Sequence, residues 1–155
     1  MSHFYLDASA AVKRYSLETG SAWVRALADP LAGHTIVLGE ITLAEVAAAF
    51  AAKHRAPGGI TRGERDRALA LFLGHCDIEY ELIALSRYTI DRAVHLTQNY
   101  RLRGYDAVQL ATALIANEAL VAAGLPALTF VAADNDLVGM ATCQHLHARQ
   151  KAHAG

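Results

Sequence analysis

The sequence predicts a single α/β domain with a largely parallel sheet, because short apolar segments alternate with longer helical patterns along the chain. Its 155 residues fit one domain, and neither a linker nor an internal repeat divides them. Hydrophobic residues make up 54% and charged residues 19%, which is typical of a compact protein with one core. We expect the domain to cover residues 1–143 and to be followed by a polar C-terminal tail at 144–155, of the kind that is often mobile.

Four short segments have the composition of buried parallel strands, because they are rich in aliphatic and aromatic residues and end at turn-forming residues. The predicted strands cover residues 4–6, 34–38, 81–85 and 127–132. Beyond Met140 no further strand pattern is visible, so the sequence leaves the C-terminal edge of the sheet open.

Seven helices are expected between and after these strands. They cover residues 8–15, a short stretch from about 21, and 41–54, 61–76, 86–100, 106–123 and 134–140. Several begin with a recognisable signal: Asp7 or Ser9 can cap the first helix, and Ser86 can cap the fifth. Thr61 and Glu64 have the spacing of a capping box at the start of the fourth helix.

Four acidic residues stand where the pattern calls for apolar or small residues. They are Asp7, Glu45, Asp106 and Asp134. Glu45 is the clearest case, because it is the only charged residue in the apolar run 41–52. An ionised carboxylate in an apolar setting loses roughly several kcal/mol of hydration unless it is paired, protonated or bound to a cation. The four acids together therefore suggest one shared cation site.

The expected positions of these acids support the same interpretation. Asp7 and Asp134 follow predicted strands, and the crevice of an open parallel sheet lies beyond the carboxyl ends of its strands. Glu45 and Asp106 lie on helices that packing can bring to that edge. Oxygen ligands suit Mg²⁺ or Mn²⁺, which often contact phosphate oxygens, so phosphodiester hydrolysis is the natural chemistry. Each aspartate is also explained as an ordinary helix N-cap, and Glu45 as a residue on the exposed edge of its helix.

The same residues resemble the PIN domains, specifically the VapC-type toxins of type II toxin–antitoxin systems. The similar segments are residues 6–10, Glu45 within its helix, 103–113 and 129–134. Their order and spacing agree across nearly the whole chain. The resemblance implies a PIN-like three-layer α/β fold, with a mostly parallel sheet of four to five strands flanked by helices. It also implies a cleft of three or four acids that binds Mg²⁺ or Mn²⁺ and cleaves RNA, with Asp7, Glu45, Asp106 and Asp134 as those acids.

The resemblance also implies supporting residues and partners. Ser9 is expected to support the first acid by hydrogen bonding, and Asp136 either assists the site or is a first-turn residue favoured by the helix dipole. A toxin of this type is a metal-dependent ribonuclease that a cognate VapB-type antitoxin inhibits, in a homodimer or a toxin–antitoxin hetero-oligomer. Candidate RNA-binding residues are Arg62, Arg65, Arg67, Arg101 and Arg103. A solvated helix face explains the first three arginines at least as well.

Two other functions remain open within the same family. A non-toxin PIN nuclease in RNA processing or decay would use the same acids, and a catalytically silent PIN domain would bind RNA or protein instead. A receiver-like signalling domain is disfavoured, because it needs a lysine after a late strand and none of Lys13, Lys53 and Lys151 follows one. The net charge of −1 gives no overall attraction to nucleic acid, so RNA binding would depend on local patches.

A cytoplasmic location without membrane contact is expected. The N-terminal residues lack the basic and apolar regions of a signal peptide, and no apolar stretch reaches the ~20 residues that a membrane span needs. Cys76 and Cys143 have no metal-ligand spacing and are interpreted as reduced thiols.

Overall fold

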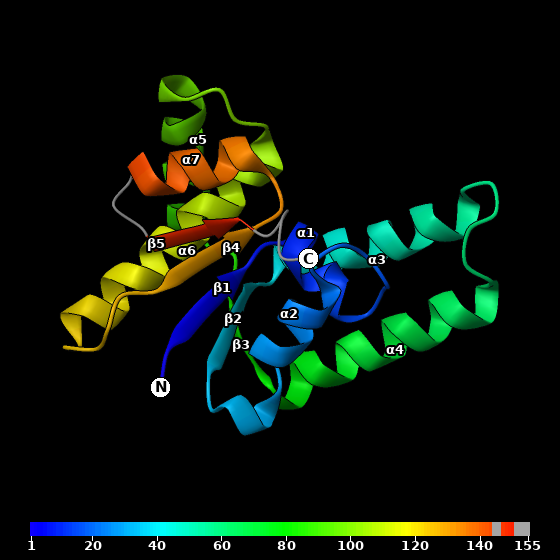
Figure 1. The fold of residues 1–155 in the computed structure, drawn as a ribbon. Coiled ribbons are helices and arrows are strands. Elements are labelled where there is room, and N and C mark those ends of the chain that lie inside the picture. Colours follow the sequence, from blue (N-terminus) through cyan, green and yellow to red (C-terminus); the bar gives the residue numbers. More distant parts are fainter. Residues whose placement is uncertain (144–146, 151–155) are drawn as a thin grey trace.

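The computed structural model describes residues 1–143 and 147–150, which form a three-layer α/β fold around a parallel sheet (Figure 1). The strands are β1 His3–Leu6, β2 Thr35–Gly39, β3 Tyr80–Ile83, β4 Thr129–Ala132 and β5 His147–Gln150. They are arranged in the order β3-β2-β1-β4-β5, and every neighbouring pair is parallel. The predicted fold class is therefore confirmed.

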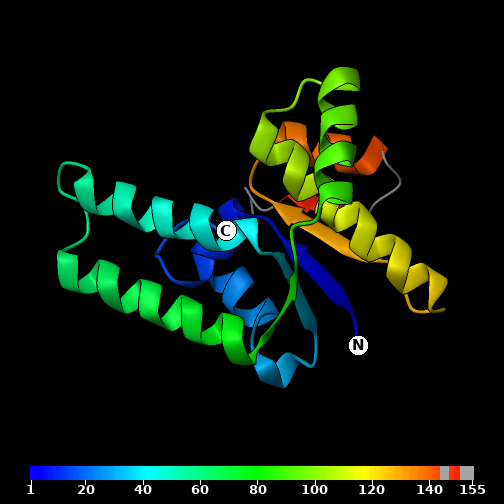
Figure 2. The same cartoon turned by 180° about the vertical axis from the view of Figure 1, so that it is seen from behind.

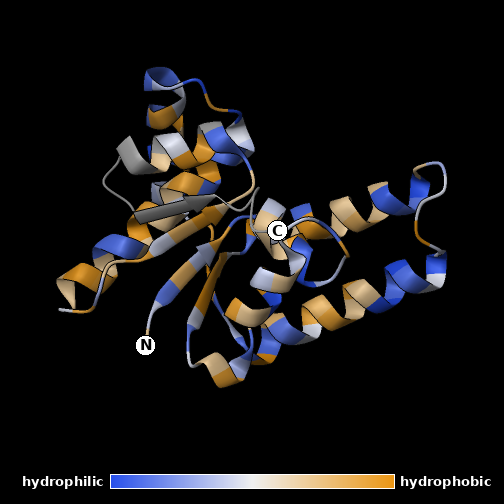
Figure 3. Cartoon of the chain, in the orientation of Figure 1, coloured by the Kyte–Doolittle hydropathy of each residue, from blue (hydrophilic) through white to orange (hydrophobic). Residues whose placement is uncertain are grey.

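Helices cover both faces of the sheet (Figures 1 and 2). One face carries α1 Ala8–Ala11, the 3-10 helix η1 Val12–Arg14, α2 Ser21–Leu27, α3 Ile41–Arg55 and α4 Arg62–Ile78. The other face carries α5 Arg87–Asn99, α6 Gly104–Ala122 and α7 Asn135–Cys143. A second 3-10 helix, η2 Pro30–Ala32, precedes β2. The long pair α3 and α4 projects from the body of the domain, and its far end is hydrophilic (Figure 3).

The strands supply side chains to two separate cores, because successive residues of a strand point to opposite faces. Tyr5 and Phe130 belong to the core beneath α5, α6 and α7, whereas Phe4, Leu6 and Val131 belong to the core beneath α1 to α4. Burial on both faces explains why the strands are continuous apolar runs in the sequence. Within the part of the chain that the structure describes, no helix has the length and apolar character to cross a bilayer.

Several predicted helix boundaries shift in the structure. The first helix is α-helical only to Ala11 and continues as the 3-10 helix η1. Helix α6 begins at Gly104, two residues earlier than expected, so Asp106 lies in its first turn and Arg103 occupies the N-cap position. The capping box that begins at Thr61 and the N-cap at Ser86 are both confirmed.

Strand β5 was not predicted. It pairs in parallel with β4, with Phe130 opposite Ala148, and so extends the sheet at its C-terminal edge. Its sequence His-Ala-Arg-Gln has no alternating apolar pattern, because an edge strand can be held by main-chain pairing that any residue provides. The sequence leaves this edge of the sheet open, and with β5 the sheet has five strands, within the four to five expected. Residues 144–146 and 151–155 of the expected tail lie outside the described residues.

Candidate active site

A crevice is expected where the chain reverses its direction along the sheet, at the carboxyl edge between β1 and β4. From β1 the chain continues to β2 and β3 on one side, and it then crosses over to β4 on the other side. Asp7 follows β1 directly, and Asp134 comes two residues after the end of β4. Both predicted strand-end acids therefore lie at this switch in strand order.

Two cavities at this edge hold the predicted acids. The larger, of about 660 Å³, is lined by Asp7, Ser9, Arg101, Leu102, Arg103, Asp106, Asp134 and Leu137. A second, of about 460 Å³, is lined by Asp7, Ala8, Ser9, Glu45, Ala48, Ala49, Ala52, Asp106 and Gln109. Because Asp7, Ser9 and Asp106 line both cavities, we treat them as one acid cleft, with Glu45 on one side and Asp134 on the other. The structure brings all four predicted acids to this cleft.

Asp7 is at once a helix cap and the most buried acid of the cleft. Its Oδ1 accepts a hydrogen bond from the Ala10 amide at 2.9 Å, and only 5% of the residue is exposed. Burial raises the pKa of Asp7 to about 6, the hydrogen bonds from Ser9 and Ala10 oppose this rise, and the charges of Glu45 and Asp106 add to it. Neither explanation from the sequence excludes the other, because one carboxylate serves as N-cap and faces the cleft.

The hydrogen bond expected for Ser9 is present. Its hydroxyl donates to Asp7, with Oγ at 2.7 Å from Oδ1, and accepts from the Ala133 amide at 2.9 Å. Ser9 therefore connects the start of α1 to the segment that carries Asp134, although the two are more than a hundred residues apart.

Glu45 is half-buried on α3 and lines the smaller cavity, so it does not lie on an exposed edge of its helix. Its Oε2 accepts a hydrogen bond from Nε2 of Gln109, whose side chain is buried on α6. Burial raises the pKa of Glu45, the hydrogen bond from Gln109 lowers it, and the charge of Asp106 raises it further. The sequence alone does not indicate a role for Gln109. The available signal was a carboxamide three residues after Asp106 in an otherwise apolar stretch of helix.

Asp106 and Asp134 complete the row of acids. Burial raises the pKa of Asp106, the charge of Asp134 raises it further, and the Arg103 guanidinium lowers it. Asp134 is exposed, and its Oδ1 accepts from the Leu137 amide at 3.1 Å at the start of α7. The charge of Asp134 thus raises the pKa of Asp106, and the charge of Asp106 raises the pKa values of Asp7 and Glu45. Like charges that interact in this way favour a bound cation.

The donor chemistry fits a hard divalent cation. Among the described residues, no three His, Cys, Asp or Glu side chains lie close enough together to form a preassembled metal site. Mg²⁺ does not need one, since it keeps several waters and is usually bound through one or two carboxylates together with substrate phosphate oxygens. The cleft supplies carboxylate oxygens, an arginine-lined rim and room for such a phosphate.

The structure separates the five candidate arginines into two groups. Arg101 and Arg103 line the larger cavity beside Asp106 and Asp134. The other three lie on α4: Arg62 and Arg65 pair with Asp66 at 3.9 and 2.7 Å, and Arg67 lines a different cavity with Glu64. Arg62, Arg65 and Arg67 are therefore not at the acid cleft, because α4 belongs to the projecting helix pair. A role of these three arginines in RNA binding stays a prediction.

Asp136 lies in the first turn of α7 by its backbone, and its side chain is outside the described part of the chain. Its role thus stays a prediction.

A parallel sheet with a carboxylate-lined cleft at its carboxyl edge defines this protein as an α/β protein with an acidic cleft. The chain belongs to the PIN domain family, whose sequence model matches residues 4–125. Members of this family are generally nucleases and typically use divalent metals, so the match supports a nuclease.

Among solved structures, the chain is similar to one described as a toxin-antitoxin complex from Klebsiella pneumoniae. The two chains share 17% sequence identity with a TM-score of 0.64, over 97% of this chain and 99% of the other. At this identity the similarity shows a common fold. A comparison with curated protein sequences gave no match.

Proposed function

We propose that this protein is a Mg²⁺- or Mn²⁺-dependent endoribonuclease and the VapC-type toxin of a toxin–antitoxin pair in the cytoplasm. The observation that carries the proposal is that Asp7, Glu45, Asp106 and Asp134 reach one cleft from four separate parts of the chain. The pKa values of Asp7, Glu45 and Asp106 are raised, and a set of like charges of this kind weakens the folded state, so a role that requires them explains their presence. The structural similarity to a chain from a toxin-antitoxin complex supports the toxin assignment.

The four acids would hold the cation together with the waters that it keeps, and the cation would supply a nucleophilic water at neutral pH and neutralise charge on the phosphate oxygens. Ser9 would keep the Asp7 carboxylate in place by its hydrogen bond. Arg101 and Arg103 would bind backbone phosphates of the RNA at the rim of the cleft. Hydrolysis by a positioned water needs no covalent intermediate on the protein. Preference for RNA would then come from contacts around the cleft.

The same charge distribution suits inhibition by a VapB-type antitoxin. A basic side chain of the antitoxin that entered the acid cleft would pair with these carboxylates and compete with the cation. We accordingly propose that the protein exists as a homodimer or a toxin–antitoxin hetero-oligomer, and that the free toxin is the active form.

Cleavage of purified total RNA by the isolated chain tests the proposal. The reactions contain Mg²⁺, Mn²⁺ or excess EDTA, and compare the wild type with Asp106→Asn and with Asp77→Asn, which removes an exposed acid from α4. We expect cation-dependent cleavage by the wild type and Asp77→Asn, and its loss in Asp106→Asn with an unchanged circular dichroism spectrum. Equal cleavage by all three proteins would point to a contaminating nuclease. No cleavage by any of them, with the antitoxin removed, would contradict the proposal and favour a binding function.

A further inference from the structure

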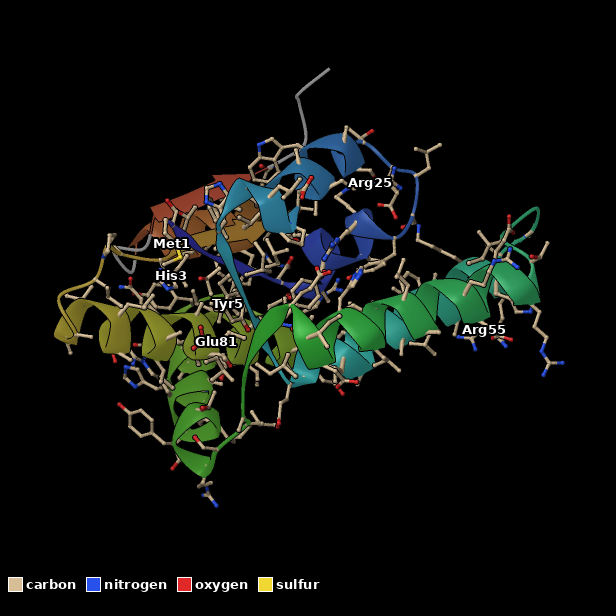
Figure 4. All side chains as sticks on the ribbon, turned by 90° about the horizontal axis from the view of Figure 1, so that it is seen from below. Met1, His3, Tyr5, Arg25, Arg55 and Glu81 are labelled. Atoms are coloured by element: carbon tan, nitrogen blue, oxygen red, sulfur yellow. The ribbon has the colours of Figure 1, made fainter. Side chains whose placement is uncertain are left out.

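A buried hydrogen-bond network runs from the central strand of the sheet to Glu45 in the acid cleft. The Tyr5 hydroxyl donates to Oε1 of Gln109 at 2.6 Å, and Nε2 of Gln109 donates to the Thr42 hydroxyl at 2.9 Å and to Glu45. Tyr5 and Thr42 are 0% exposed and Gln109 is 1% exposed. Tyr5 is labelled in Figure 4, in the interior between the sheet and α6.

The chemistry of the partners fixes the orientation of the Gln109 carboxamide. An ionised carboxylate can only accept hydrogen bonds, so Glu45 must face the NH₂ end of Gln109. The oxygen end then faces Tyr5, whose hydroxyl is able to donate. A reversed amide would place two oxygen acceptors against each other at Glu45.

The surrounding fold fixes Tyr5 in turn. Its ring stacks on Phe130, with ring centroids 5.7 Å apart and an angle of 12° between the planes. At position 39 a Cβ atom would lie only 2.8 Å from the Tyr5 hydroxyl oxygen, so the glycine there leaves the space that the phenol needs. Tyr5 is therefore a rigid support for the carboxamide.

An apolar side chain at position 109 would be simpler to bury. The neighbouring residues on α6, including Leu110, Ala111 and Ala113, are buried and apolar, and a buried amide costs stability unless its groups are hydrogen-bonded. Glu45 is the partner through which this network reaches the cleft, since it lines the 460 Å³ cavity and is half-buried. The hydrogen bond to Glu45 therefore explains why a polar residue is buried at position 109, where packing alone would favour an apolar one.

We propose that Gln109 is a positioning residue of the active site: its buried carboxamide, oriented by Tyr5 and Thr42, holds the Glu45 carboxylate in place for cation binding. Gln109 donates to Oε2 of Glu45, and the carboxylate held in this way would contribute to binding the cation. The inference rests on the proposed function and adds to it a route by which the sheet sets the geometry of one acid. Outer partners of metal-binding residues commonly contribute about 10- to 100-fold to metal affinity.

Two variants of the full-length chain test this role. Gln109→Leu removes the carboxamide at similar size, and Tyr5→Phe removes only the hydroxyl that orients it. Asn117→Leu is the matched control, because Asn117 is a partly buried amide on the same helix whose Oδ1 accepts from the Leu128 amide, away from the cleft. The measurements are Mn²⁺ affinity by calorimetry, unfolding by urea, and kcat and KM for RNA cleavage at saturating Mn²⁺.

We expect Gln109→Leu to bind Mn²⁺ about 10-fold more weakly and to lower kcat, with little change in the KM for RNA. Tyr5→Phe should cause a smaller loss of the same kind, whereas Asn117→Leu should lower stability without changing Mn²⁺ affinity. Wild-type Mn²⁺ affinity and kcat in folded Gln109→Leu would overturn the inference. If Gln109→Leu does not fold, Tyr5→Phe decides in the same way.

Asp106→Asn separates this inference from the proposed function. A wild-type chain that binds no Mn²⁺ would overturn both. Binding that is lost in Asp106→Asn but retained in Gln109→Leu and Tyr5→Phe would overturn only the role of Gln109.

Discussion

Two polar clusters, one at the carboxyl edge of the sheet and one beside β3, are built on opposite principles. The acid cleft gathers side chains of one sign. The second, which we call the tyrosine cluster, consists of Arg14, Tyr15, His75, Glu79 and Tyr80. In that cluster the Arg14 guanidinium donates to Glu79 and to the Tyr80 hydroxyl, both at 2.7 Å. The Tyr15 hydroxyl oxygen lies 2.8 Å from Nδ1 of His75.

The difference separates stability from function. In the tyrosine cluster every charge has a partner of opposite sign or a hydrogen bond, so the cluster ties η1 to α4 and β3. In the acid cleft, burial and neighbouring carboxylates raise the pKa values of Asp7, Glu45 and Asp106. The first arrangement stabilises the fold without a ligand, whereas the second becomes favourable when a cation is shared. Substitutions in the two clusters should therefore have opposite consequences.

Neutralising the cleft should have the largest effect of all, and that effect should fall on activity. We expect Asp106→Asn to reduce RNA cleavage by about 10² or more, because it removes a cation ligand and its charge. The free energy of unfolding of the metal-free variant should be equal to or above that of the wild type, since like-charge repulsion is relieved. Paired cleavage assays and urea titrations check both parts. A large loss of stability in Asp106→Asn would mean that Asp106 serves mainly to stabilise the fold.

Breaking the tyrosine cluster should lower stability and leave activity nearly unchanged. Arg14→Ala removes a guanidinium that is only partly exposed and leaves Glu79 without it, so we expect a loss of about 2 kcal/mol in the free energy of unfolding. Cleavage by the folded fraction should stay near that of the wild type. Urea unfolding together with cleavage rates, corrected for the folded fraction, measures this. Loss of activity in the fully folded variant would show that the two clusters are coupled.

The two clusters should also respond oppositely to pH. Burial raises the pKa of Asp7 from 3.8 to about 6, so the folded state binds this proton more tightly than the unfolded chain does. The metal-free protein should therefore gain stability from the cleft as pH falls from 7 to 5, by about 1 kcal/mol. Burial and the charge of Arg14 lower the pKa of His75, so the tyrosine cluster should lose stability as pH falls through 6.5.

Single substitutions separate these two contributions. Urea titrations at pH 5 and pH 7 measure the free energy of unfolding of each variant. The stability gained at pH 5 should be smaller in Asp7→Asn than in the wild type, and the stability lost at pH 5 should be smaller in His75→Gln. Saturating Mg²⁺ should remove the gain from the cleft, because a cation favours the ionised carboxylates. An unchanged pH dependence in Asp7→Asn would contradict the pKa assignment.

The smallest effect concerns the two groups of arginines. Arg103→Ala should raise the KM for RNA several-fold and weaken its dependence on salt, because Arg103 lines the cleft beside Asp106. Arg62→Ala should change the KM little, since this side chain lies on the exposed face of α4 near Asp66. Cleavage kinetics at two salt concentrations compare the two variants. Equal effects would mean that the projecting helices also contact the RNA.

The central strands, most helices and the four acids could be predicted because each leaves a local signal. Strands buried on both faces appear as apolar runs, and Glu45 is conspicuous because an apolar helix surrounds it. Strand β5 leaves no such signal, since main-chain pairing at the edge of a sheet does not require apolar residues.

Other features depend on contacts between distant parts of the chain. The role of Gln109 depends on its hydrogen bonds to Tyr5, 104 positions away, and to Glu45, 64 positions away. Which arginines reach the cleft depends on how far α3 and α4 project from the body, and Arg55 marks the far end of that pair in Figure 4. No local pattern carries this information.

Calorimetric titration with Mn²⁺ tests most directly whether the acids of separate elements share one cation site. The proteins compared are the wild type, Asp7→Asn, Glu45→Gln, Asp106→Asn, Asp134→Asn and the control Asp77→Asn, each shown to be folded by circular dichroism. A shared site predicts that every cleft variant binds Mn²⁺ at least about 10-fold more weakly than the wild type, while the control binds normally. Wild-type affinity in all four cleft variants would contradict a shared cation site.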